Sequence, residues 1–152
     1  MALLKIARMG HPVLIRRAEE VADPTAREVR RLIEDMIATM EDAEGVGLAA
    51  PQVHVGRRII IFKAPPSRAG DDEDASAVSP LSVLINPEIE PLDEEMIDGL
   101  EGCLSIPGLT GVVPRYARIR YRGFAPNGAP VERMASGFHA RVVQHETDQM
   151  NG

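Results

Sequence analysis

Residues 137–149 constrain the fold of this chain most, because they predict a helix whose buried side carries polar groups. One helical stripe, at spacings of three and four residues, contains Phe138, Val142, His145 and Gln149. Glu146 lies beside that stripe. Since the stripe mixes apolar and polar side chains, we expect the other elements to pack around this helix and to enclose its polar groups.

A second helix is predicted over residues 25–43, where the apolar side chains share one face. That face contains Val29, Leu32, Ile33, Met36, Ile37 and Met40. Thr25 and Glu28 form the pattern of a capping box, and Gly45 is expected to end the helix.

Strands are predicted between the two helices. β-Branched residues favour a largely buried strand over residues 57–62. Residues 83–86 resume a strand, which Pro87 restricts to a sheet edge or a strand end. Residues 112–123 contain alternating arginine and apolar side chains, and a turn rich in Pro, Asn and Gly returns the chain to a partner near residues 131–135.

The length of 152 residues suits one domain with one core, so residues 1–152 are expected to form a single unit. Strands at intervals, with helices near both ends, favour the α+β class. Residues 64–80 are rich in Pro, Ser, Gly and acids, and are predicted to be a mobile surface loop inside the domain.

The composition limits the partners. With 44% hydrophobic and 26% charged residues the chain matches soluble globular proteins, and no apolar run approaches the roughly 20 residues that span a bilayer. The N-terminal segment is too short and too charged for a secretory signal, so a cytoplasmic location is expected. The net charge of −6 argues against direct nucleic-acid binding, and the arginines within residues 115–122 are interpreted as a solvated strand face.

The sequence His145-Glu146-Thr147-Asp148-Gln149 nearly matches the motif H-E-x-x-H, with glutamine at the second histidine position. In that motif two imidazoles one helical turn apart bind one metal ion, and the glutamate faces a metal-bound water. A lone histidine on a helix is ordinarily a core residue. The neighbouring glutamate, a poor core residue, favours a functional role for His145.

Cys103 is the only cysteine, so no intrachain disulfide can form. Flanked by Gly102 in what is predicted to be an extended loop, it is a buried core residue, a nucleophile or a metal ligand. A thiolate, an imidazole and a third ligand leave one position open for water, as in catalytic metal sites. Glu146 can then accept a proton from water and deliver it to a leaving group.

The third notable segment is residues 45–52, Gly-Val-Gly-Leu-Ala-Ala-Pro-Gln. Its small residues permit another backbone to approach closely, and Gln52 offers a neutral amide donor. A phosphate-binding loop is disfavoured because the G-K-[ST] ending and the G-x-G-x-x-G spacing are both missing. A tight turn that merely needs small residues for packing is the structural alternative.

Taken together and in order, residues 45–52, 101–105 (Glu-Gly-Cys-Leu-Ser) and 144–148 (Gln-His-Glu-Thr-Asp) resemble the three motifs of the peptide deformylases. Gly10-His11-Pro12-Val13-Leu14, Ile85-Asn86-Pro87 and residues 137–141 extend the resemblance over almost the whole chain. It implies antiparallel sheets packed around a central helix that carries metal ligands. It also implies removal of the N-formyl group from the formyl-methionine of nascent polypeptides, with the ribosome exit region as a further partner.

The resemblance implies one divalent metal ion, Fe(II), which zinc or nickel can replace. Glu146 matches the general acid and base. Gln52 and the backbone N–H of Leu104 match the pair that holds the formyl oxygen as it becomes an oxyanion. The three metal-ligand positions are Cys103, His145 and Gln149.

The same resemblance implies how the substrate binds. The backbone around Val46, Gly47 and Gly102 would pair with the peptide as an added strand. Phe138 and Val142 would help to wall the methionine pocket.

The chain departs from the family pattern in two places. Gln149 occupies the position of a histidine ligand, and the sequence stops at Gly152, where members usually continue through a further strand or tail. A neutral amide oxygen suits a soft transition metal less well than imidazole, so weak metal retention and low or absent turnover are expected. The alternative is that Gln149 binds the metal through oxygen with only a mild loss.

Two other functions remain open at this point. A non-catalytic module would keep the groove for formyl-Met or Met-starting peptides without the metal. A cysteine enzyme would use Cys103 as nucleophile with His145, but Glu146 would then have no evident task.

Overall fold

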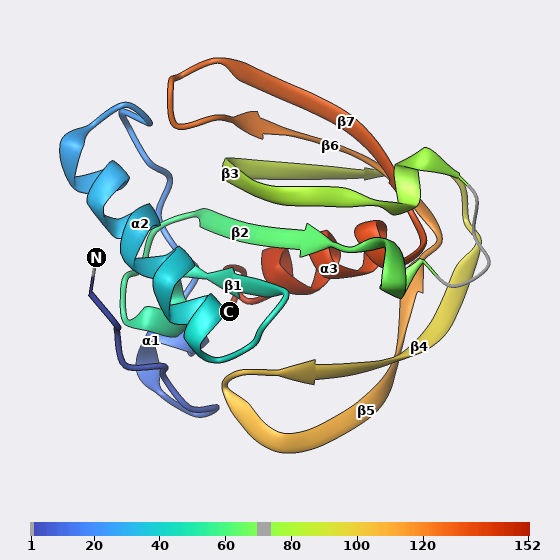
Figure 1. Cartoon of the computed structure of the whole chain (residues 1–152), viewed down its shortest axis with the longest axis horizontal. Helices are drawn as coiled ribbons and strands as arrows, with labels where there is room; N and C mark the ends of the chain where they lie inside the picture. Colours follow the sequence, from blue (N-terminus) through green and yellow to red (C-terminus); the bar gives the residue numbers. More distant parts are fainter. Residues whose placement is uncertain (1, 70–73) are drawn as a thin grey trace.

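A computed structural model of the chain describes residues 2–69 and 74–152. Two antiparallel sheets enclose one central helix (Figure 1). The larger sheet has the order β1-β2-β3-β6-β7, formed by Gly47–Ala49, Ile59–Ala64, Ser79–Pro91, Arg118–Phe124 and Pro130–Ser136. The smaller sheet pairs β4 (Met96–Cys103) with β5 (Ile106–Tyr116). This arrangement confirms the α+β prediction.

The described residues also form the α-helices α1 (Pro12–Ile15), α2 (Arg27–Asp42) and α3 (Gly137–Asp148). Short 3-10 helices cover Ala50–Val53, Pro66–Arg68 and Ala75–Ala77. Helix α3 lies between the two sheets, and α2 lies at one end of the larger sheet (Figure 1). Among the described residues, the model contains no helix with both the length and the apolar character needed to cross a membrane.

Strand β2 is buried on both sides, and this explains its unbroken run of apolar residues. Ile60 and Phe62 belong to the core cluster that includes Val143 of α3. Ile59 and Ile61 belong to a second cluster with α2, whose members include Ile33, Met36 and Met40. Because neighbouring residues of a strand point to opposite faces, β2 joins the two clusters.

The predicted helix over residues 25–43 is confirmed as α2, but its predicted caps are wrong. Ala26 is the N-cap, and Asp23 Oδ1 instead accepts hydrogen bonds from the backbone N–H of Thr25, at 2.9 Å, and from its hydroxyl, at 2.6 Å. At the other end the left-handed residue is Glu44, with φ 57°, while Gly45 donates its N–H to Met40. A Cβ at Gly45 would lie 3.0 Å from Leu104 Cδ1, so glycine is needed there for space.

Pro87 does not lie at a strand end, so that part of the prediction is wrong. The pairing of β3 with β2 stops at Ile85, however, which leaves one edge of β3 without a described strand partner at Pro87. Pro87 falls inside β3, the middle strand of the larger sheet, where the pairing with β6 shifts between Ile85 and Glu88. Asn86 adopts φ 54° at this bulge, and its side chain bonds both backbone groups of Val21 at 2.8 and 2.9 Å. A proline is tolerated because the bulge already interrupts the ladder.

Residues 112–123 form parts of two strands in different sheets, β5 and β6, rather than one strand. The alternation itself is confirmed in β6, where Ile119 and Tyr121 are buried between exposed or partly exposed arginines. The expected loop over residues 64–80 contains the last residue of β2, two 3-10 helices and the start of β3. Residues 70–73 of that segment lie outside the described residues.

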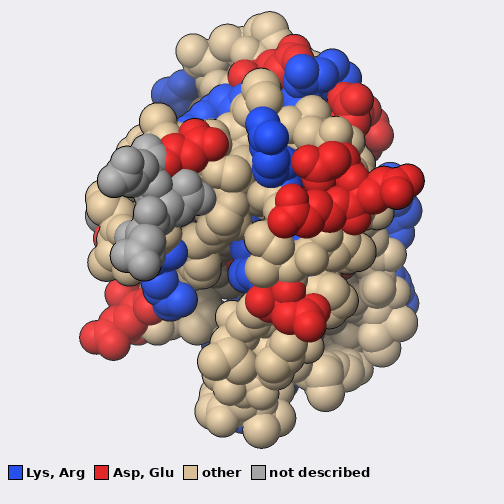
Figure 2. Space-filling model, turned by 90° about the vertical axis from the view of Figure 1, so that its right-hand side faces the viewer, with Lys and Arg blue, Asp and Glu red and all other residues tan. Residues whose placement is uncertain are grey.

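The smaller sheet, called the β4–β5 arm below, projects from the body (Figure 1). Several of its large apolar side chains are exposed, namely Met96, Ile97, Leu100, Leu109 and Val112. On the face that Figure 2 shows, acidic side chains lie in several separate groups, the largest at the right, with basic side chains beside them.

Candidate active site

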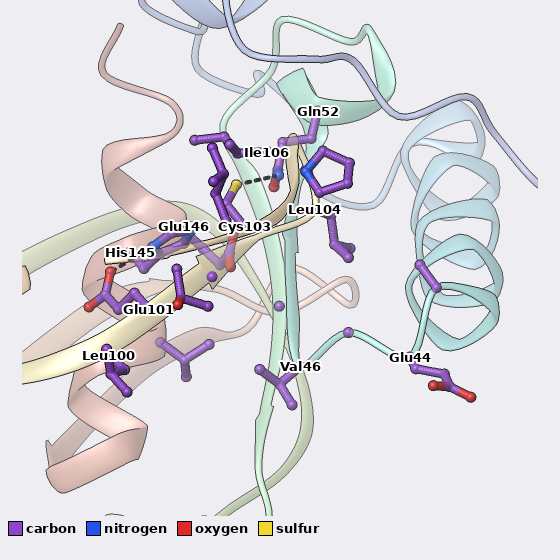
Figure 3. A pocket seen from close by; sticks show the side chains of 18 of the residues that line it. Glu44, Val46, Gln52, Leu100, Glu101, Cys103, Leu104, Ile106, His145 and Glu146 are labelled. Carbon is purple, nitrogen blue, oxygen red and sulfur yellow. Dashed lines mark hydrogen bonds and ion pairs between the residues drawn. The ribbon is translucent and has the colours of Figure 1, made fainter. Parts of the chain in front are cut away.

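The described segments bring Cys103, His145 and Glu146 together at the end of a cavity (Figure 3). Cys103 is the last residue of β4, so it lies in a strand rather than in the expected loop. His145 and Glu146 lie in the last turns of α3. A bulge between Gly102 and Cys103 interrupts the strand pairing next to the thiol.

Gln52 is fixed so that its amide nitrogen faces Cys103. Its Oε1 accepts the backbone N–H of Ala49 at 2.9 Å, which leaves Nε2 to donate to Cys103 Sγ at 3.4 Å and to Ser105 Oγ at 3.1 Å. The side chain is 1% exposed. A buried donor held in this way is preorganised for an oxygen atom that gains charge beside the thiol.

Gln149 caps the C-terminal end of α3 and reaches the same sulfur. Its Nε2 lies 3.4 Å from Cys103 Sγ. As placed, the amide therefore donates to the thiol, and a rotation of the amide by 180° would direct its oxygen to the same region. Cys103 and His145 thus lie together as predicted. Gln149, the third of the predicted metal-ligand residues, also lies beside Cys103, with its side-chain amide near the sulfur.

Glu101, which the sequence analysis quoted only as part of a motif, organises the site. Its Oε1 accepts from His145 Nδ1 at 2.8 Å and from Arg115 Nη2 at 2.9 Å. Its Oε2 accepts from Arg141 Nη1 at 2.7 Å and from Arg115 Nε at 3.0 Å. Burial alone would raise the pKa of Glu101, but the hydrogen bonds from His145, Arg115 and Arg141 hold this pKa at about 2. A permanently charged Glu101 fixes the ring of His145, so that Nε2 is the nitrogen facing Cys103.

The pKa values of His145 and Glu146 are both raised, but by different causes. Burial lowers the pKa of His145, yet hydrogen bonds with Cys103 and Glu101 outweigh it and raise this pKa to about 10. Burial raises the pKa of Glu146 to about 7, despite the opposing charge of His145. A carboxyl group with a pKa near neutrality can both accept and return a proton, as general acid–base catalysis requires.

Glu146 is 4% exposed, and its Oε1 is a buried atom without a hydrogen-bond partner among the described residues. A Cβ at Gly47 would overlap the other side of this carboxylate, so glycine there makes room for it. A buried polar atom left unpaired is costly, and its retention beside a thiol and an imidazole indicates a partner that binds there.

The donors fit a divalent transition metal at two of three positions. Thiolate and imidazole suit zinc and ferrous iron, and Glu101 provides the carboxylate–histidine contact that orients such ligands. Over residues 2–69 and 74–152, no group of three His, Cys, Asp or Glu side chains is placed to hold a metal ion. The third donor is the amide of Gln149, which fits through its oxygen but binds such a metal more weakly than imidazole does.

The cavity has a volume of about 640 Å³ and is lined by all five predicted substrate-binding residues. Val46, Gly47, Gly102, Leu104, Phe138 and Val142 all contribute to its wall. The backbone of Gly47 pairs with Phe62 of β2, and Gly102 pairs with Thr110 of β5. Phe138 is covered by the guanidinium of Arg68, 4.8 Å from the ring centroid.

Sequence reasoning did not assign site roles to Ser105, Arg115, Arg141 or Glu101. Arg115 pairs with Glu101 and also with Asp148 of α3. The arginine alternation suggested a solvated face, but the side chain of Arg115 is only 14% exposed because β5 packs its end against α3. Of these residues, Glu101 could have been found from the sequence, because it is the first residue of the second motif.

Soft donors beside a buried acid–base group, at the end of an apolar cavity, place this chain in the class of metal-dependent hydrolases. The polypeptide deformylase family model matches residues 3–152. Peptide deformylase 1 of Bordetella pertussis is 54% identical over 147 residues, covering 97% of this chain and 82% of the relative. Peptide deformylase 1 of Xanthomonas axonopodis pv. citri is 52% identical over 148 residues, covering 97% and 85%.

Solved structures agree with these relatives. The Met-Ala-Ser-bound class I type b peptide deformylase from Acinetobacter baumannii has a TM-score of 0.88 and 36% identity, covering 100% of this chain and 96% of that chain. The peptide deformylase from Ehrlichia chaffeensis in complex with actinonin has a TM-score of 0.90 and 34% identity, covering 99% and 85%. The chain belongs to the polypeptide deformylase family.

Proposed function

We propose that this chain removes the N-formyl group from the N-terminal formyl-methionine of nascent polypeptides, using one divalent metal ion held by Cys103, His145 and Gln149. The observation that carries this proposal is the unpaired, buried Oε1 of Glu146 beside Cys103 and His145. Such an atom needs a partner, and a water molecule at the metal position would provide one.

When bound, the metal would supply Lewis-acid chemistry and lower the pKa of water. Glu146 accepts the proton of the attacking water and returns it to the leaving amine, and its pKa of about 7 suits both steps. Gln52 Nε2, together with the backbone N–H of Leu104, stabilises the oxygen of the formyl group as it gains negative charge. One well-placed donor of this kind contributes about 3 to 4 kcal/mol.

The peptide lies along the cavity as an added strand, between the backbone at Val46 and Gly47 on one side and Gly102 on the other. Phe138 and Val142 form the wall for the methionine side chain. The similar solved structure with Met-Ala-Ser bound supports a peptide as ligand.

The resemblance to peptide deformylases implies Fe(II), with zinc or nickel as substitutes, and a thiolate with an imidazole can bind each of these ions. Its affinity is weakened by Gln149, whose amide is a poorer donor than imidazole. We expect low metal occupancy and slow turnover as a result. The protein works in the cytoplasm near the ribosome exit region, where formylated chains emerge, and it needs no direct contact with nucleic acid.

The test compares the wild-type protein with Gln149→His and Gln149→Leu, each loaded anaerobically with Fe(II) or Ni(II). The readouts are metal content by elemental analysis and release of formate from formyl-Met-Ala-Ser. Metal content and turnover should rise with Gln149→His and fall with Gln149→Leu, which is close to glutamine in size but has no amide. If Gln149→His increases neither quantity, the role given to position 149 is wrong.

A second candidate function is supported by Gln149 itself: a module that binds formyl-Met or Met-starting peptides without catalysis. Calorimetric titration of the metal-free protein with formyl-Met-Ala-Ser and Met-Ala-Ser distinguishes the two. Saturable binding without formate release, even after metal loading, would favour the module. Absence of both binding and turnover in the loaded wild-type protein would contradict both candidates.

A further inference from the structure

The β4–β5 arm carries Glu101 and Cys103, and within the described part of the chain it shares no strand pairing with the larger sheet. A two-stranded sheet alone is marginally stable in water, so other contacts must fix its position. The position matters, because Cys103 lies on the arm whereas His145 lies on α3. Whatever attaches the arm to α3 therefore sets the distance between the two strong metal donors.

Arg141 of α3 contributes to this attachment, beside the contacts of His145 with Glu101, of Asp148 with Arg115 and of Gln144 with Tyr116. Its Nη2 donates to the backbone oxygen of Ile97 on β4 at 2.5 Å, and its Nη1 donates to the backbone oxygen of Val113 on β5 at 2.7 Å. Nη1 also lies 2.7 Å from Glu101 Oε2. Among the described residues, no other side chain of α3 bonds to the backbone of both strands, since Gln144 bonds only to Tyr116 on β5.

The arm is shaped to receive this guanidinium. The side chain of Arg141 is 12% exposed, so its charge is largely removed from water and compensated by Glu101. A Cβ built at Gly99 would lie 2.7 Å from Cζ of Arg141 and 2.9 Å from Nε. The guanidinium thus lies against bare backbone at Gly99, and any side chain at position 99 would push it away.

We propose that Arg141 is a positioning residue that holds the β4–β5 arm against α3, so that Cys103 and His145 face each other across the metal position. A planar guanidinium can reach three acceptors in a fixed geometry, whereas a lysine can reach fewer and holds them less rigidly. The inference rests on the metal site proposed above, because the distance between the two donors has a functional meaning only if they share an ion.

The first experiment titrates Co(II) into the wild-type protein, Arg141→Met, Arg141→Lys and Gly99→Ala, and follows the near-ultraviolet absorption of cobalt bound to a thiolate. Outer contacts of this kind change metal affinity by about 10- to 100-fold. We expect Co(II) binding about tenfold weaker or worse in Arg141→Met and in Gly99→Ala, with Arg141→Lys between these variants and the wild type. Arg120→Met, which breaks exposed ion pairs with Glu90 and Glu132, is the matched control and should bind as the wild type does.

The second experiment measures hydrogen exchange in the arm of the metal-free proteins, so it does not depend on the metal site. Amides of residues 97–113 should exchange about tenfold faster in Arg141→Met and unchanged in Arg120→Met. If Arg141→Met does not fold, Arg141→Lys and Gly99→Ala provide the same comparison.

Folded variants with wild-type Co(II) affinity and wild-type exchange would overturn the inference. Arg141 also lines the cavity, and a role confined to that wall would leave both the Co(II) affinity and the exchange rates unchanged. If the wild-type protein binds no Co(II), the proposed metal site fails, and the exchange rates alone decide whether Arg141 attaches the arm.

Discussion

His139 should make the stability of the metal-free protein depend on pH between 6.5 and 4. The side chain is 0% exposed and is stacked beside Phe62. Its Nδ1 lies 2.7 Å from the backbone oxygen of Ser76, which can only accept, so Nδ1 carries the hydrogen. Nε2 of the neutral ring then accepts the hydroxyl of Tyr121 at 2.9 Å. No ring nitrogen is left for an additional proton.

Burial lowers the pKa of His139 from 6.5 to about 4 in the folded protein, against the hydrogen bond to Ser76, which raises it. Between pH 6.5 and pH 4, His139 is therefore protonated in the unfolded chain but neutral in the folded protein. Stability is lost as the pH falls through this range. With these two pKa values, the loss from this one group is about 2 kcal/mol at pH 5 and about 3.4 kcal/mol once the pH is well below 4.

The assay is urea unfolding followed by circular dichroism at pH 7.5 and pH 5, for the wild-type protein, His139→Gln and His54→Asn. Carboxyl groups contribute similarly to all three proteins, so the difference between variants isolates the histidine. The wild-type protein and His54→Asn, which changes an exposed histidine, should lose about 2 kcal/mol more than His139→Gln between the two pH values. Equal losses in all three proteins would refute the neutral, buried state of His139.

Two further predictions concern backbone positions. Gly47→Ala places a Cβ against the Glu146 carboxylate and should lower turnover, measured as formate release, by about a hundredfold. Gly56→Ala is the control, because a Cβ there meets no heavy atom within 4 Å, and it should leave turnover unchanged. Equal activities of the two variants would show that the carboxylate is free to move. Asn86→Ala removes two hydrogen bonds to Val21 at a left-handed position and should destabilise the protein by about 2 to 4 kcal/mol in urea. Asn86→Gly should lose about 1 kcal/mol less, since glycine accepts that backbone conformation, and a larger loss than for alanine would contradict this reasoning.

Both long helices were predictable because their signal is local. In α2 and α3 the spacing of apolar residues is set by the helix period, which the sequence displays directly. The path of β3 through Pro87 was not predictable, because the bulge that permits it depends on a hydrogen-bonded contact between Asn86 and Val21, 65 residues apart. Local preferences near a proline ordinarily favour a strand end. In this protein, tertiary hydrogen bonds outweigh those preferences, and the strand continues.

In the site, too, local motifs were predictable from the sequence and tertiary contacts were not. Cys103, His145 and Gln52 could be named because motifs carry them, whereas the bonds that orient them join different segments. Arg141 lies in the segment 137–141 that shares the family resemblance, but its three acceptors on β4 and β5 become visible only when the arm is folded. Likewise, the left-handed residue after α2 is the exposed Glu44, which the sequence does not indicate. The glycine that follows it is explained by the nearby side chain of Leu104, which belongs to a distant segment.

The place of α3 in chain order has a consequence for translation. Every strand of both sheets precedes α3 in the sequence, yet the apolar side chains of Phe62 and Tyr121 pack in the same cluster as Val143 of that helix. During synthesis those surfaces are complete before the helix that covers them has been made. The growing chain therefore exposes this apolar surface until α3 leaves the ribosome, and during that time chaperone binding or aggregation competes with folding. Cys103 of β4 and His145 of α3 can come together only once this helix has been made.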